Sequence, residues 1–61
     1  MTTYEIRSRF IGNKRFHRNQ ITTDPKRAEL ITNNMKQYAC YAQIKIIVTD
    51  DNGVKNELII K

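Results

Sequence analysis

The spacing of two apolar series around a glycine near the C-terminus constrains the fold of this chain most. Alternate residues are apolar over positions 42–48, and the same holds for positions 54–60 apart from Asn56. Because side chains alternate between the two faces of a strand, the loop length decides whether both series share a face. A three-residue loop, Asp51-Asn52-Gly53, with Gly53 left-handed after a type I turn, brings them together, whereas a two-residue turn separates them. The pairs predicted by this register are Asp50 with Val54, Val48 with Asn56, Ile46 with Leu58 and Ile44 with Ile60.

Two further strands and a turn are predicted in the first third of the chain. Residues Thr3–Ile11 largely alternate between apolar and charged side chains, which is typical of a half-buried strand. A turn signal at residues 12–14 leads to a second strand over Phe16–Thr22. In a regular strand, the side chains of Phe16 and Ile21 would point to opposite faces of the sheet. Both can face the same side only if the strand has a bulge or ends between them, so the register of this hairpin stays open. The side chains predicted to share the core face of the first strand are Tyr4, Ile6, Ser8 and Phe10.

Asp24 and Pro25 predict the start of a helix. Aspartate can cap the first free backbone amides, and proline fits the first helical position because its missing N–H would have no partner there. No glycine follows to end the helix, which is expected to fray near residues 39–41. The buried stripe predicted from helical spacing consists of Ala28, Ile31, Met35 and Tyr38.

Together these elements predict one small α+β domain over residues 1–61, in the order β-β-α-β-β. One helix packs on one face of an antiparallel sheet of two hairpins, and the order of the strands within the sheet stays open. On the uncovered face, Lys45 should lie diagonal to Glu57. Ile47 and Ile59 share that face, and Ile11 could extend them into an apolar contact patch.

The small size of the chain limits how the domain can be stabilised. A chain of 61 residues buries a small core, and domains of this size often gain support from a disulfide, a metal or a partner. One cysteine cannot form an intrachain disulfide, and one cysteine with one histidine cannot form a structural zinc site. We therefore expect no cofactor and no metal, with added stability from a partner or from weak self-association. The sequence has no apolar run long enough to span a membrane and no signal peptide, so we expect a soluble intracellular protein without membrane contact.

The excess of positive charge lies in the first half of the chain. The net charge is +5, and residues 1–27 contain seven basic and two acidic residues, whereas residues 28–61 contain four of each. Such a patch attracts nucleic acid or an acidic protein surface, although it also serves solubility. The nucleic-acid alternative rests on basic residues interleaved with aromatic ones, which could follow a phosphate backbone and stack bases. These residues are Arg7, Arg9, Arg15, His17 and Arg18, together with Phe10 and Phe16.

The sequence contains no recognisable catalytic set. His17 has no serine, cysteine or carboxylate placed as its partner, and nothing marks Cys40 as an activated thiol. Asp50 and Asp51 fall at the predicted hairpin turn, where aspartate is common for conformational reasons. The chain also lacks a glycine-rich phosphate loop. We therefore expect a binding protein rather than an enzyme.

Several short pieces of the chain occur in an order that is also found in a known family. These pieces are Ile11-Gly12, Phe16, Ile21-Thr22, Gln37-Tyr38-Ala39, Ala42, Lys45, Asp50-Asp51 and Val54. In this order, and over nearly the whole chain, they resemble the Dmd antitoxins of T4-like bacteriophages. The resemblance implies a viral protein of a toxin-antitoxin system that acts in the cytoplasm of the infected host. It would bind and inhibit an RnlA/LsoA-type endoribonuclease toxin, which degrades messenger RNA, by direct protein-protein contact.

Charge and composition limit how such an inhibitor could act. The predicted helix has Leu30 and Ile31 but lacks the tryptophan that one member of the family carries in mid-helix, so the toxin that is recognised stays open. A chain with a charge of +5 cannot imitate RNA phosphates, so it would fill a cleft or lock domains, with charges at the rim speeding encounter. Tyrosine and arginine are frequent anchors of interfaces. The predicted partner-binding residues are Asn33, Asn34, Gln37 and Tyr41, with Arg15 and Arg18 as steering charges.

Overall fold

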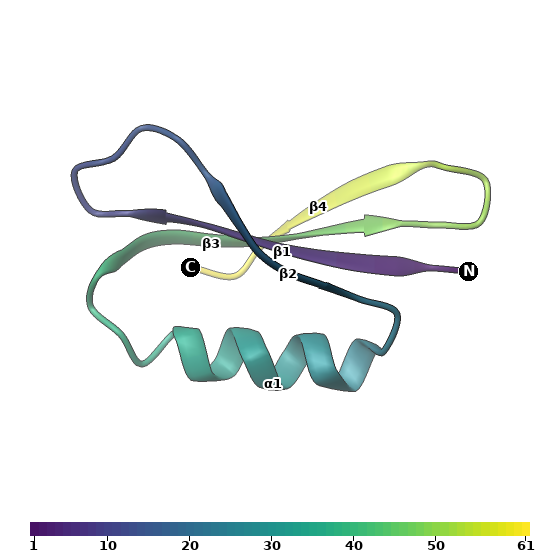
Figure 1. Ribbon diagram of the computed structural model, residues 1–61, viewed down its shortest axis with the longest axis horizontal. Helices are drawn as coiled ribbons and strands as arrows, with labels where there is room; N and C mark the ends of the chain where they lie inside the picture. Colours follow the sequence, from purple (N-terminus) through teal and green to yellow (C-terminus); the bar gives the residue numbers. More distant parts are fainter.

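Four antiparallel strands and one helix follow the predicted β-β-α-β-β order in the computed structural model, which describes residues 1–61 (Figure 1). The elements are β1 (Thr3–Phe10), β2 (His17–Thr22), α1 (Pro25–Met35), β3 (Tyr41–Thr49) and β4 (Lys55–Ile59). The strand order, which the sequence pattern left open, is β2-β1-β3-β4. The two hairpins therefore join through β1 and β3 at the centre of one sheet, and β2 and β4 form its edges. The predicted fold class is confirmed.

The register predicted for the last hairpin is confirmed. Val48 pairs with Asn56 and Ile46 pairs with Leu58, and Gly53 has a φ of 81° in the left-handed region that favours glycine. The Asp50 carboxylate accepts hydrogen bonds from the amides of residues 52 and 54, both at 2.9 Å, which holds the turn closed. On the uncovered face, the predicted diagonal pair is present, with 3.1 Å between Lys45 Nζ and Glu57 Oε1.

A bulge in β2 sets the register of the first hairpin, which the sequence pattern left open. β2 begins at His17, one residue later than predicted, and Asn19 has no opposite partner because the pairing with β1 shifts between Ile6 and Arg7. Ser8 Oγ donates a hydrogen bond to Asn19 Oδ1 at 2.6 Å, which ties the extra residue to β1. Ile21 pairs with Glu5 on the uncovered face of the sheet. The Phe16 ring reaches that face as well, because its centroid lies 4.2 Å from Lys45 Nζ.

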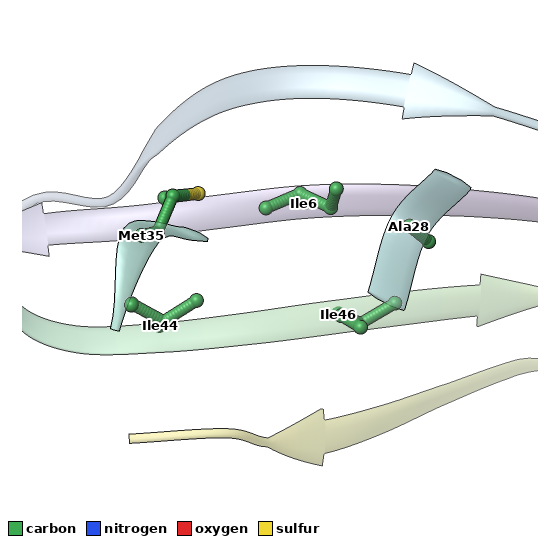
Figure 2. Close-up of a cluster of buried hydrophobic side chains, with 5 residues drawn as sticks. All are labelled: Ile6, Ala28, Met35, Ile44 and Ile46. Carbon is green, nitrogen blue, oxygen red and sulfur yellow. The ribbon is translucent and has the colours of Figure 1, made fainter. Parts of the chain in front are cut away.

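The core lies between α1 and the two central strands. Figure 2 shows side chains from α1 facing isoleucines of β1 and β3, while neither edge strand contributes a fully buried residue. The Asp24 carboxylate caps α1 as predicted, accepting a hydrogen bond from the amide of Lys26 at 3.0 Å. The five buried hydrophobic residues are Ile6, Ala28, Met35, Ile44 and Ile46.

The predicted buried stripe of α1 is correct in its first part and wrong in its last. Ala28 and Met35 are buried and Ile31 is half-buried, but Tyr38 is 53% exposed. The reason is that α1 ends at Met35, earlier than the fraying expected near residues 39–41, so helical spacing no longer applies to Tyr38. Thr32, which was not part of the predicted stripe, is also buried. Its hydroxyl donates a hydrogen bond to the carbonyl oxygen of Ala28 at 3.0 Å, so the buried polar group has a partner.

The single helix covers only part of the sheet. α1 packs closely against β1, β2 and β3 but not against β4. A groove of about 270 Å³ therefore remains between α1 and β4, with Val48, Leu58 and Ile60 among its lining residues. α1 has 11 residues and is too short and too polar to cross a membrane.

Candidate partner-binding surface

Four aromatic rings gather at one end of the sheet, and we call them the aromatic cluster: Phe10, His17, Tyr38 and Tyr41. The rings of Phe10 and Tyr41 stack with centroids 5.2 Å apart and planes inclined by 20°. Tyr38 meets Tyr41 edge to face at 6.4 Å, and His17 lies 6.2 Å from Phe10 on the other side. These separations are within the range in which aromatic pairs attract each other. The cluster is therefore a continuous row of rings rather than four separate side chains.

The backbone places the cluster beyond the C-terminal end of α1. Phe10 ends β1 and pairs with Tyr41, the first residue of β3, after a shift of register at Arg9. The amide of Ile11 donates to the carbonyl oxygen of Cys40 at 3.0 Å and holds the two chain segments together. Because α1 stops at Met35, no helical turn covers these rings.

Most of the aromatic cluster is open to solvent. Phe10 is 39% exposed and Tyr38 is 53% exposed, and His17 is also exposed. Tyr41 is half-buried and packs against the core, so it anchors the row to the body of the domain. Exposed, rigid aromatic side chains on a fixed base are the type of residue that contributes most to protein interfaces.

Three of the predicted partner-binding residues lie at this end of the molecule. Tyr41 belongs to the cluster, and Gln37 is exposed next to Tyr38 in the segment that joins α1 to β3. Arg15 is exposed in the loop between β1 and β2. Figure 1 shows this loop and the segment after α1 at the same end of the sheet. The structure thus brings part of the predicted set to one surface.

The other three predicted residues, Asn33, Asn34 and Arg18, do not lie on one surface. Neighbouring residues on a helix point about 100° apart, and accordingly Asn33 lines the groove beside β4 whereas Asn34 does not. Arg18 lies on β2 and forms an ion pair across the uncovered face, with 3.6 Å between Nη1 and Glu5 Oε2.

The uncovered face of the sheet carries a line of three cations that we call the basic row: Arg18, Arg7 and Lys45. They are direct neighbours across β2, β1 and β3. Glu5 lies 3.2 Å from Arg7 Nε and also pairs with Arg18, while Lys45 pairs with Glu57. Like charges directly opposite one another are unfavourable in a sheet. Two carboxylates for three cations leave the row net positive.

The apolar contact patch predicted on the uncovered face is present in part. Ile47 and Ile59 lie on that face because they pair with Glu57 and Lys45, and Ile59 is 64% exposed. Ile11 is exposed in the turn after β1, outside the strand, and does not extend this pair along the sheet.

The residues considered for catalysis or metal binding are dispersed. Cys40 and His17 are both exposed, and neither lines the groove. The Asp50 carboxylate binds backbone amides of its own turn, and Asp51 forms an ion pair with the N-terminal amino group. The structure contains no cluster of three or more His, Cys, Asp or Glu side chains that could hold a metal ion.

Neither family models, nor curated protein sequences, nor solved structures give a match to this chain.

Sequence reasoning missed most of the aromatic cluster. Periodicity predicts Phe10 and Tyr38 in the core, and the nucleic-acid alternative groups His17 and Phe10 with basic residues but without Tyr38 or Tyr41. The structural reason is where the helix ends, because α1 stops at Met35 and does not cover Phe10, the last residue of β1. The sequence offered no glycine or proline to mark that end.

Proposed function

We propose that this protein is a non-catalytic antitoxin of the Dmd type, which binds an RnlA/LsoA-type endoribonuclease in the cytoplasm of a phage-infected cell and blocks its activity. The observation that carries the proposal is the exposed aromatic cluster. Its Tyr38 belongs to the Gln37-Tyr38-Ala39 piece on which the resemblance rests, and it is 53% exposed instead of buried in the core. A match at an exposed tyrosine is better explained by contact with a partner than by packing.

The dimensions of the molecule support inhibition by insertion into a cleft. Its principal extents are 35 × 22 × 15 Å, and its radius of gyration is 11.4 Å, against about 10.5 Å for a compact chain of this length. A thin body with aromatic side chains at one end can enter a cleft between two domains. Its net charge of +5 has the wrong sign for imitating the RNA substrate, so we assign the inhibition to blocking the toxin's cleft or its domain motion.

The proposal is tested by adding the purified protein to an RnlA/LsoA-type toxin and a labelled messenger RNA. We expect cleavage to stop near stoichiometric inhibitor and a complex of the two proteins to elute together on a sizing column. Undiminished cleavage at a large excess of the protein, with no complex, would contradict the proposal.

A second candidate function, binding of single-stranded nucleic acid, is favoured by the basic row and by the adjacent Phe16. Lysine and arginine side chains can neutralise phosphates, and an aromatic ring can stack on a base. The two candidates differ in how strongly the binding affinity depends on salt. Contacts with phosphates release counterions, whereas contacts between aromatic side chains and a protein surface do not.

If nucleic acid is the ligand, replacing Arg15 and Arg18 together by glutamate should lower the affinity for a single-stranded RNA at least tenfold at low salt. Both side chains are exposed, so the fold should survive. The matched control is Lys26→Glu with Arg27→Glu, which makes the same change of charge on exposed positions of α1. Fluorescence anisotropy measures both. No binding of RNA or DNA by the wild-type protein at low salt would eliminate this candidate.

A further inference from the structure

The two edges of the sheet differ in how they are protected. β2 contains the bulge at Asn19, which discourages pairing with another strand. β4 has no register shift, no proline and no helix beside it, and all five of its residues are exposed. An exposed, regular edge strand with apolar side chains readily pairs with another strand. β4 is therefore the edge that a partner strand can use.

The backbone of β4 presents free hydrogen-bonding groups at alternate residues. Ile60 donates to the carbonyl oxygen of Ile44 at 2.8 Å, and Val54 accepts from the amide of Asp50 at 3.0 Å. Since pairing alternates along an antiparallel ladder, the even-numbered residues from 54 to 60 direct their backbone groups toward β3. Lys55, Glu57 and Ile59 consequently direct theirs away from the sheet.

We propose that a second copy of this chain pairs with β4, antiparallel, about a twofold axis that passes between the two Asn56 residues. In this register Lys55 lies opposite Glu57 of the second copy on the uncovered face. Val54 lies opposite Leu58 of the second copy on the face that carries α1. The symmetry repeats both pairs, so two pairs of opposite charge and two apolar pairs form at once, which are favourable cross-strand combinations.

The neighbouring registers lack this complementarity. If the axis passed between the two Glu57 residues, their carboxylates would face each other, and Asn56 would face Leu58 of the second copy. An axis through Leu58 places Glu57 opposite Ile59. Among axes through residues 55–58, only the one at Asn56 brings opposite charges together. Charge complementarity thus selects both the occupant, a second copy of the chain, and the register.

The dimer would cover side chains that the monomer leaves open. Val54 and Leu58 are 53% and 54% exposed, and each becomes a cross-strand neighbour of the other across the new interface. The helices of both copies lie on the same face of an extended sheet, with the two grooves next to each other. The interface formed by one pair of strands has a small area, so we expect a dimer that dissociates on dilution.

Sedimentation equilibrium over a range of protein concentrations tests this proposal. The wild-type protein should form dimers reversibly as its concentration rises. Lys55→Glu and Glu57→Lys should each raise the dissociation constant at least tenfold, because each change places like charges opposite one another twice. An equimolar mixture of these two variants should dimerise again, since the introduced glutamate then faces the introduced lysine and native Lys55 faces native Glu57.

Two further measurements keep the test independent of any effect on folding. Lys14→Glu makes the same change of charge in the exposed loop between β1 and β2 and should dimerise like the wild type. Hydrogen exchange of the wild-type amides of Lys55 and Glu57 should slow with increasing protein concentration.

Three results would overturn the proposal: a wild-type protein that stays monomeric at about 1 mM, a dimer that responds equally to Lys55→Glu and Lys14→Glu, or a mixture of variants that does not associate. A monomer whose β4 amides become protected only when a toxin is added would also overturn it, and would assign this edge to a strand of the toxin.

Discussion

Replacement of Ile44 by alanine is expected to leave a large fraction of the protein unfolded at 25 °C. Ile44 is fully buried and lies among only five buried hydrophobic residues. Removing such a side chain costs about 2–5 kcal/mol, from lost transfer free energy and from the cavity left behind. Domains of this size have a free energy of unfolding of only about 3–5 kcal/mol from a single core. Urea titrations followed by circular dichroism measure the change directly.

The matched control for this substitution is Ile21→Ala. Ile21 is 51% exposed at the edge strand β2, and its replacement should cost less than about 1 kcal/mol. If Ile44→Ala and Ile21→Ala reduce the free energy of unfolding equally, the core described between α1 and the central strands is not the stabilising core of this protein.

Replacement of Tyr38 by alanine should raise the concentration needed for half-inhibition of the toxin at least tenfold, and Phe10→Ala with Tyr38→Ala should raise it further. The reason is that truncating an aromatic anchor of an interface costs more than about 1.4 kcal/mol of binding free energy. Tyr38→Phe keeps the ring and should retain most of the inhibition. The RNA cleavage assay, with the toxin held constant, measures all three variants.

Leu30→Ala provides the control for a general effect of losing an exposed apolar side chain. Leu30 is 70% exposed on α1 and lies outside the aromatic cluster, so its loss should leave inhibition unchanged. A folded Phe10→Ala and Tyr38→Ala double variant that inhibits as well as the wild type would place the binding surface elsewhere on the molecule.

The part of the fold that could be predicted is the part that local spacing decides. In the last hairpin, only one loop length brings both apolar series to the same face, so the pairing of Ile46 with Leu58 followed from the sequence. The cap at Asp24 followed from local chemistry in the same way. Strand order is different, because it depends on which strands meet across the core, and alternation alone does not choose between β1 and β2 as the neighbour of β3.

The candidate site was less predictable because it depends on where a helix stops. Lys36 and Gln37 are both good helix formers, so the spacing of Tyr38 was consistent with one more buried turn. The structure ends α1 at Met35 instead, which exposes Tyr38 and leaves Phe10 uncovered. The sequence predicts that Asn33 and Asn34 point in different directions, because neighbouring residues of a helix are about 100° apart. Which of the two faces the groove depends on the position of β4, which the sequence left open.

The pairing of β1 with β3 has a consequence for how fast this domain folds. Tyr4 lies beside Val48, so the two central strands of the sheet are far apart in the sequence. Contacts between such distant residues slow folding, since a long loop must close before they form. The core around Ile6 therefore forms only when β1 and β3 have met, so the domain is expected to fold more slowly than a helical domain of the same size.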